Sequence, residues 1–283
     1  MTESNFGEAG SPPTAPWIEK TYQEEIPDDI RPFREILENY SHIPANEVDA
    51  HLHVIRDKAW AAARYPCVGM WSFTDLRCVE DPIFERAITR LKTPESGDAL
   101  LDVGCGLGQV IRKLAADGVE PTKLYGSDLL PSYLDLGFEL FKDRGRFANN
   151  FVAADLLQPD ITALAGLEGK ITLVHAGNFF HLFGWEKQVH IGSTLVQLLR
   201  PEAEGAMIFG RQIGRLHAGE LISWKGDTRY WHDLGSLQKL WDEIGSKTGT
   251  SWKVDAKWLG KLPFQSDSLP EDIHYLSFTA YKL

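Results

Sequence analysis

The stretch Leu100-Leu101-Asp102-Val103-Gly104-Cys105-Gly106-Leu107-Gly108 decides the fold of this chain of 283 residues. It opens with an apolar run, closes with three glycines at alternate positions and leads into a helical pattern at 107–117. Glycines at a turn between a strand and a helix let the backbone bend sharply and let a ligand come close to it. The stretch therefore predicts a buried strand, a ligand-binding turn and a helix, in that order.

Beyond this turn, short apolar runs alternate with helical stretches. The runs predict strands at 99–106, 123–129, 151–156, 170–177 and 205–213, with helices at 107–117, 131–144, 160–167, 185–200 and 236–248. Two last strands are expected near 251–259 and 274–282 as an edge hairpin, with a Pro-rich excursion from Leu262 to Pro270 between them. Strands that are apolar on both faces and alternate with helices are typical of a parallel sheet covered on both sides, so the predicted fold class is α/β.

The N-terminal third of the chain has a different pattern. Residues 1–17 are rich in Gly, Pro, Ser and Thr without periodicity, which predicts a disordered tail. Three helices are expected next, one capped by Asp28 and Asp29, one opened by Pro44 and one begun by Asp81-Pro82. An aromatic loop, 65–73, lies between the last two. We therefore expect a helical N-terminal cap at 18–96 and a ligand-binding domain at 97–283.

The spacing of the glycines and of two acids describes the ligand. A dinucleotide fingerprint would need its third glycine at position 109, which is Gln109. Asp102, two residues before the first glycine, would clash with a pyrophosphate but suits an ammonium group, directly or through water. Asp128 ends the second strand, where an acid can accept hydrogen bonds from both ribose hydroxyls. A ligand with a ribose, an ammonium group and no phosphate fits these residues; a plain tight turn with incidental surface acids is the alternative.

The third strand adds Asp155 and Leu156. An acid at this strand end can accept from an adenine amino group while the leucine covers the ring. A helix cap or a solvated turn is the alternative for Asp155.

With these residues in place, the chain resembles the class I S-adenosylmethionine-dependent methyltransferases through LLDVGCGLG, YGSDL and AADLL, in the right order and spacing. A narrower resemblance, to small methyltransferases of fungal secondary metabolism including meroterpenoid pathways, rests on HAGNFFHLFGWEKQ, LLRPEAEGAMIFGRQIG and the YPCVGMW loop. The resemblance implies a Rossmann-like, seven-stranded, mostly parallel sheet, bound S-adenosylmethionine at 97–283 and a helical cap over the acceptor. The cofactor-binding residues expected are Asp102, Gly104, Gly106, Gly108, Asp128, Leu129, Asp155, Leu156 and His175.

Acceptor residues are expected beyond the carboxyl ends of the strands, where ligands of open α/β sheets bind. The candidates for catalysis are His181, Arg211 and His232, and those for substrate binding are Trp71, Phe73, Asn178, Phe180 and Gln212. Arg211 could clamp a substrate carboxylate through its guanidinium. Several of these residues also have a simpler alternative. His181 can be a packed core histidine, Arg211 a surface ion pair and His232 a helix cap, and the aromatic loop can be core packing rather than a lid.

Composition limits the partners. The formal net charge is −11, which disfavours phosphate backbones and anionic lipid, and no stretch approaches eighteen consecutive apolar residues. Three cysteines without CxxC spacing indicate reduced thiols in the cytosol. We expect a protein that binds small molecules and no metal. A homodimer stays open, and an exposed apolar face on the N-terminal helices would favour it.

The predicted function is O-methylation of a small acid or phenol, to a methyl ester or phenol ether of a secondary metabolite. Nitrogen or carbon acceptors, a protein that binds S-adenosylmethionine without transferring its methyl group, and a protein or nucleic-acid methyltransferase are the alternatives.

Overall fold

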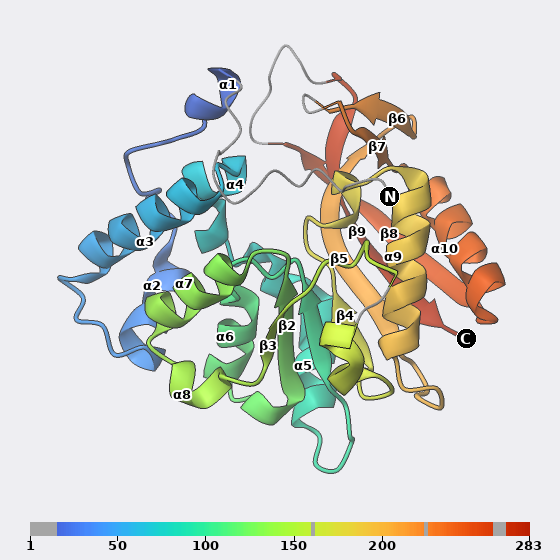
Figure 1. The fold of residues 1–283 in the computed structure, drawn as a ribbon, viewed down its shortest axis with the longest axis horizontal. Coiled ribbons are helices and arrows are strands. Elements are labelled where there is room, and N and C mark those ends of the chain that lie inside the picture. Colours follow the sequence, from blue (N-terminus) through green and yellow to red (C-terminus); the bar gives the residue numbers. More distant parts are fainter. Residues whose placement is uncertain (1–15, 160–161, 224–225, 263–269) are drawn as a thin grey trace.

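The computed structural model describes residues 16–159, 162–223, 226–262 and 270–283. A seven-stranded sheet in the order β3-β2-β1-β4-β5-β9-β8 forms its centre (Figure 1). The strands are β1 (Leu100–Val103), β2 (Leu124–Asp128), β3 (Phe151–Ala153), β4 (Leu173–His175), β5 (Met207–Arg215), β8 (Trp252–Lys261) and β9 (Ile273–Lys282). The first five are parallel, and β9 and β8 follow as antiparallel strands at one edge. The predicted mostly parallel sheet and its edge hairpin are confirmed.

Helices cover both faces of the sheet because neighbouring side chains of each strand point to opposite sides. Leu101, Val174 and Ile208 pack in one core with α9 (Trp185–Leu198) and α10 (Leu234–Thr248). Leu100 and Leu173 pack in a second core on the other side. The helices of that side are α5 (Pro82–Lys92), α6 (Gln109–Ala116) and α7 (Pro131–Phe141). The strand ends and the glycine turn are thereby fixed between two apolar layers.

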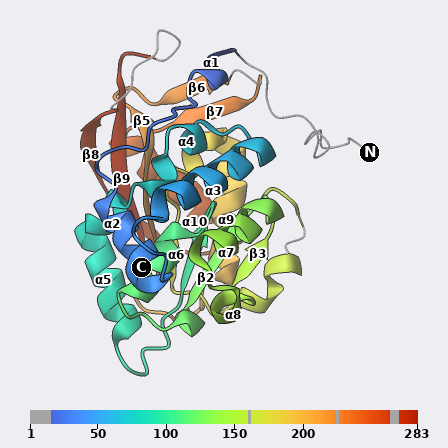
Figure 2. The same cartoon turned by 90° about the vertical axis from the view of Figure 1, so that its left-hand side faces the viewer.

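The N-terminal segment forms a helical cap that packs on α7 (Figure 2). Its elements are α1 (Pro16–Glu19), α2 (Arg31–Glu35), the π-helix η1 (Ile36–Tyr40), α3 (Val48–Ala62), α4 (Pro66–Gly69) and the 3₁₀ turns η2 (Ser72–Thr74) and η3 (Arg77–Glu80). Tyr133 of α7 donates its buried hydroxyl to the carbonyls of Ala59 (3.2 Å) and Ala63 (2.9 Å) at the end of α3. This contact joins the cap to the first helices of the sheet. No helix among the described residues is long and apolar enough to span a membrane.

Several predicted element boundaries were wrong. Asp28 and Asp29 do not cap the first helix, which begins at Arg31 with Ile30 as an N-cap that makes no side-chain bond. Pro44 lies in a turn before α3, since Glu47 N–H donates to its carbonyl and the helix begins at Val48. Asp81, in contrast, caps α5 by accepting from Ile83 N–H, as expected.

Most of the other predicted helices are shorter than expected, whereas α10 begins two residues before the predicted start at 236. The helix expected at 131–144 ends at Phe141, and α8 (Arg144–Phe147) follows. Within 160–167 the described part is the 3₁₀ helix η5 (Thr162–Leu167). Two further short 3₁₀ segments are η4 (Pro121–Lys123) and η6 (Phe180–Leu182). Most of the predicted tail (residues 1–15) and of the Pro-rich excursion (263–269) lies outside the described residues.

A two-stranded ribbon after β5 was not predicted. It consists of β6 (Gly219–Ile222) and β7 (Thr228–Trp231), paired antiparallel, and extends the carboxyl end of β5 (Figure 1). Trp231 is buried with Leu262 and Ile273 beneath it. The ribbon and the cap therefore flank the edge of the sheet at which the predicted site lies.

Candidate active site

The glycine turn after β1 has a backbone that other residues adopt with strain. Gly104, Gly106 and Gly108 have φ values of +64°, +57° and +71°. A Cβ at Gly104 would lie 2.5 Å from the Phe179 ring, whereas one at Gly106 would meet no protein atom within 4 Å. The turn is therefore packed on one side and open on the other, as a ligand-binding turn requires.

Asp128 ends β2 and holds this turn in place. One carboxylate oxygen accepts from Gly106 N–H at 2.8 Å and the other from Leu130 N–H at 3.0 Å. Burial raises the pKa of Asp128 above its ordinary value, although the two backbone bonds oppose the shift. Each oxygen keeps a second lone pair, so the carboxylate can still accept from hydroxyl groups of a ligand.

Asp102 and His175, both predicted to contact the cofactor, lie side by side on β1 and β4. His175 Nδ1 and Asp102 Oδ1 are 2.7 Å apart, and both side chains are buried. The imidazole packs edge-on against Phe84 and at a tilt against Phe209, and its Nε2 has no hydrogen-bond partner among the described residues. The pair therefore lies buried directly before the glycine turn, with Asp102 two residues from Gly104.

The carboxylate of Asp155 is bound within its own turn. It accepts from Leu157 N–H and from the Gln158 side chain, each at 3.0 Å. This is the turn geometry that was the alternative for Asp155. Leu156 is buried and lines the neighbouring cavity.

A cavity of about 50 Å³ lies where the glycine turn meets the ends of β2, β3 and β4. It is lined by Gly104, Ser127, Asp128, Leu129, Ala154, Leu156, Leu157, Phe179, Phe183 and Ile191. Sites for small molecules usually measure about 300–1,000 Å³, so this one must widen to take a whole cofactor. Leu129 is 40% exposed, so its side chain has room to move outward from the cavity.

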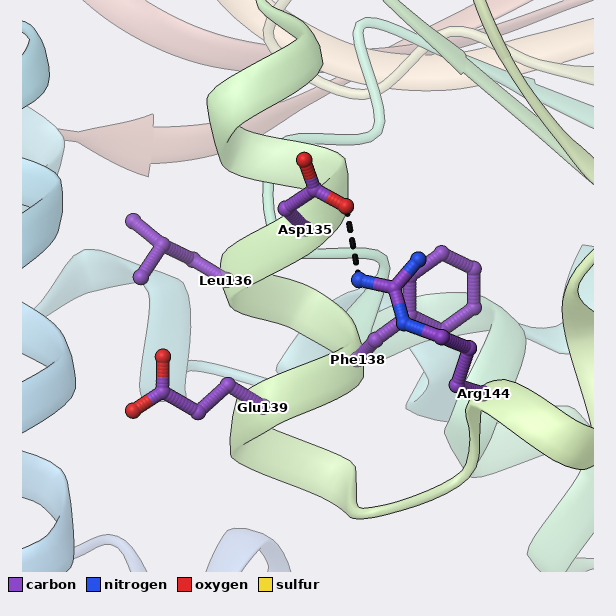
Figure 3. A pocket seen from close by; sticks show the side chains of 5 residues that line it. All are labelled: Asp135, Leu136, Phe138, Glu139 and Arg144. Carbon is purple, nitrogen blue, oxygen red and sulfur yellow. Dashed lines mark hydrogen bonds and ion pairs between the residues drawn. The ribbon is translucent and has the colours of Figure 1, made fainter.

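A larger hollow, of about 280 Å³, lies on the surface of α7 and is not the site (Figure 3). Arg144 and Asp135 form an ion pair of 2.7 Å across it, and Phe138 and Glu139 complete its wall. None of the predicted site residues lines it. We therefore assign function to the smaller cavity at the strand ends.

The aromatic residues predicted to bind substrate are core residues in this structure. Trp71 is 1% exposed, donates Nε1–H to the Gln23 carbonyl at 3.0 Å and lies under the Arg56 guanidinium. Phe73 is buried in the same core of the cap. Phe180 is buried in the core of the sheet. All three follow the packing alternative because their rings are enclosed by protein.

Arg211 forms an ion pair that joins the cap to β5. Its Nη2 donates to Asp75 at 2.7 Å, and Arg77 binds the same carboxylate through two bonds of 2.9 Å. Burial opposes ionisation of Asp75, but the two guanidinium groups outweigh burial and hold its pKa below the usual value. Arg211 is thus half-buried and paired with Asp75. This environment resembles the ion-pair alternative and not a guanidinium that is free to bind a substrate carboxylate. Asn178 is exposed beside it and donates its backbone N–H to the Arg211 carbonyl.

His232 has a structural environment. It is fully buried, with Nδ1 2.9 Å from Ser236 Oγ and Nε2 2.9 Å from Gln188 Oε1. Burial lowers its pKa to about 4. Asp233, not His232, caps α10, since it accepts from Ser236 N–H. With both ring nitrogens bonded, His232 has none left for a substrate.

His181 and Gln212 have the opposite character, because buried polar atoms of both lack partners among the described residues. These atoms are His181 Nδ1 and both amide atoms of Gln212. Burial and the charge of Arg229 lower the pKa of His181 to about 3. Arg229, from β7, also has a buried Nε without a partner. Sequence reasoning missed Arg229 because no element was predicted between 214 and 235.

Comparisons with known proteins agree with this geometry. A family model described as "Meroterpenoid methyltransferase N-terminal domain" matches residues 21–74, and one described as "Methyltransferase domain" matches 100–202. The O-methyltransferase atr3 of Stereocaulon alpinum is 36% identical over 260 residues, which cover 91% of this chain and 74% of that protein. The chain belongs to this family of fungal methyltransferases. The methyltransferase trt5 of Aspergillus terreus is 37% identical, with 83% of each chain covered.

Solved structures show the fold of the methyltransferase. The [4+2]-cyclase SpnF aligns with a TM-score of 0.50 and 14% identity, over 71% of this chain and 80% of that one. S-adenosylmethionine is the cofactor of this methyltransferase. The site fits such a molecule, since it offers a carboxylate at the end of β2, apolar leucines at the ends of β2 and β3 and an open glycine turn.

Proposed function

We propose that the methyltransferase transfers a methyl group to a carboxylate oxygen of a small secondary-metabolite acid and forms a methyl ester. The observation that carries this proposal is the state of His181, which lies beyond the end of β4 and has a buried Nδ1 without a partner among the described residues. Its pKa of about 3 makes it too weak a base to take a proton from a phenol, whose pKa is about 10. A carboxylate is already ionised at neutral pH and needs no base.

Two other findings support an oxygen acceptor of this kind. Relatives such as atr3 and phiE, 36% and 38% identical, are named O-methyltransferases. His175, which also has a buried nitrogen without a partner among the described residues, is bonded to Asp102 and packs against the Phe84 and Phe209 rings. This packing keeps it from serving as a base for a phenol.

The cofactor would be held by residues of the first three strand ends. Asp128 is proposed to accept from the ribose hydroxyls, and Leu129 and Leu156 to cover the adenine, with Asp155 near its amino group. Gly104, Gly106 and Gly108 let the methionine part approach the backbone, and the Asp102–His175 pair fixes this turn. S-adenosylmethionine supplies a methyl group already activated on a sulfonium. The protein therefore has mainly to hold the acceptor oxygen in line with it, which can supply about 7–11 kcal/mol.

The acceptor would lie between the cap and the β6–β7 ribbon. We assign Asn178, His181 and Gln212 to its polar wall, and we assign Arg211 to holding the cap closed through Asp75. Trp71, Phe73 and Phe180 shape the site from within the core, and His232 is left out of the catalytic group. Val54 is the strongly exposed large apolar side chain among the described residues of the cap, so a homodimer is not part of the proposal. All three cysteines are free, which supports action in the cytosol.

The test is methyl transfer from S-adenosylmethionine with a trideuterated methyl group to a panel of aromatic and terpenoid acids and phenols, analysed by mass spectrometry. We expect a labelled product that alkaline hydrolysis returns to the free acid, because esters are cleaved by base and ethers are not. A labelled product that resists alkali would place the methyl group on a phenol, nitrogen or carbon and refute the proposal. Bound cofactor without any labelled product from the panel would also count against it.

A further inference from the structure

The ribbon β6–β7 carries an arginine that faces inward. Arg229 pairs with Leu221 across the ribbon, and alternation places Arg229 on the same face as Trp231. Trp231 is 2% exposed and packs with Leu262 and Ile273. The half-buried side chain of Arg229 therefore points beneath the ribbon, and its Nε is buried without a hydrogen-bond partner among the described residues.

This arginine is fixed close to the cofactor cavity. Trp231 Nε1–H donates to the His181 carbonyl at 3.0 Å, and Tyr230 N–H donates to the Phe183 carbonyl at 2.9 Å. Phe183 lines the cavity, as does Phe179 on the other side of the η6 turn. Two hydrogen bonds thus hold β7 against a turn whose two flanking residues line the cavity.

The surroundings of Arg229 provide polar groups but no anion. Gln212 is fully buried on β5 with neither amide atom bonded, and its face of the strand looks toward the end of β7. Gly214, two residues further along β5, lies on the same face of the strand as Gln212. A Cβ at Gly214 would lie 2.5 Å from the carbonyl of His232, which directly follows β7. No described carboxylate forms an ion pair with Arg229, and Asp227, whose charge acts on it, is exposed. Partial desolvation of a cation is unfavourable, and a ligand that brings the opposite charge to the buried Nε would offset it.

Arg211 differs from Arg229 in this respect. Its charge is already matched by Asp75, which binds Arg77 as well. Of the two arginines near the strand ends, Arg229 is therefore the one whose pairing is incomplete.

We propose that Arg229 binds the carboxylate of the acceptor, in a subsite whose polar wall is formed by Gln212 and His181. Because Nε is the buried donor, this contact holds one carboxylate oxygen and leaves the other free to receive the methyl group. The identity of the anion as acceptor rests on the proposed function, whereas the anion subsite itself can be measured without methyl transfer.

The experiment titrates 4-fluorobenzoate, and separately the neutral 4-fluorobenzamide, into the protein saturated with S-adenosylhomocysteine, with fluorine NMR as the readout. We expect the wild-type protein to prefer the benzoate, and Arg229→Gln to weaken benzoate binding by about 10- to 150-fold, as the loss of a charge-assisted hydrogen bond predicts. Benzamide binding should not change. Arg229→Lys keeps the charge and should retain part of the preference. Arg215→Gln, which removes an arginine paired with Asp272 at the end of β5, is the matched control and should behave as wild type.

No preference for benzoate in the wild-type protein, or equal benzoate binding in wild type and Arg229→Gln, would overturn the subsite. Unchanged binding of S-adenosylhomocysteine in each variant shows that the site is folded. The outcome is separable from that of the proposed function. Benzoate binding that depends on Arg229, together with products that resist alkali, would retain the anion subsite and reject ester formation.

Discussion

Asp128 holds the glycine turn and is proposed to hold the ribose, so Asp128→Asn separates these two roles. Asparagine has the same size, but one carboxylate oxygen becomes an amide nitrogen that cannot accept a hydrogen bond. One of the two backbone donors, Gly106 N–H at 2.8 Å or Leu130 N–H at 3.0 Å, loses its acceptor. One ribose hydroxyl loses its acceptor as well. A hydrogen bond to a charged group contributes about 1.5–3 kcal/mol, so the loss of one ribose bond predicts about 10- to 150-fold weaker cofactor binding.

Stability should fall by less than cofactor binding does. Burial raises the pKa of Asp128, so the charged carboxylate lowers the free energy of unfolding. The neutral amide of asparagine removes this destabilisation. The assay is isothermal titration with S-adenosylmethionine and S-adenosylhomocysteine, combined with thermal unfolding. Asp135→Asn is the control, because Asp135 is exposed on α7 and binds Arg144 alone. Affinity within threefold of wild type, in a folded Asp128→Asn variant, would refute the assignment of the ribose to Asp128.

Three further substitutions test the structure. Asp143→Asn leaves the guanidinium of Arg112 buried without its carboxylate, and we expect urea unfolding to show a loss of about 3–5 kcal/mol; a loss as small as that of Asp135→Asn would contradict this. The pKa of His232 is lowered from 6.5 to about 4, so stability present above pH 6.5 is lost as the pH falls toward 4. His232→Asn should therefore flatten the pH dependence of the free energy of unfolding measured in urea by up to about 1.4 kcal/mol per pH unit, and identical slopes would show that His232 titrates normally. Gly106→Ala places a methyl group in open space at φ +57°; it should cost about 1–2 kcal/mol in stability and reduce cofactor affinity in calorimetry, and unchanged affinity would show that the cofactor does not approach this turn.

The part of the fold that depends on local patterns could be predicted from the sequence. Leu100 and Leu101 are both buried because a central parallel strand is covered on both faces, and this makes its sequence continuously apolar. The glycine turn could be predicted because a left-handed backbone favours glycine, and Asp128 could be predicted because it ends the next strand. Their contact spans 22 positions of the chain within one β-α-β unit.

The N-terminal helix starts and the β6–β7 ribbon could not be predicted in the same way. The cap helices take their boundaries from packing on α7, as with Tyr133 at the end of α3, and not from capping residues such as Asp28. The ribbon has strands of four residues whose stability comes from Trp231 packing on distant segments. Short strands of this kind give little periodicity of their own.

The two ends of the site also differ in whether they are built from residues close together or far apart in the sequence. This difference bears on how specificity for the acceptor can change. The cofactor end is built from turns close in sequence, whereas the acceptor end depends on pairs such as Asp75 with Arg211, 136 positions apart, and His181 with Trp231, 50 positions apart. A residue type such as arginine does not reveal in the sequence whether its charge is matched, and that is why Arg211 and not Arg229 was expected to bind the acceptor. Since the cap and the ribbon contribute no hydrogen bond to the glycine turn among the described residues, substitutions in them can alter the acceptor without weakening the cofactor. Replacing the ribbon residue Arg229 should therefore change acceptor choice and leave the affinity for S-adenosylhomocysteine within about twofold, well below the effect of one lost hydrogen bond.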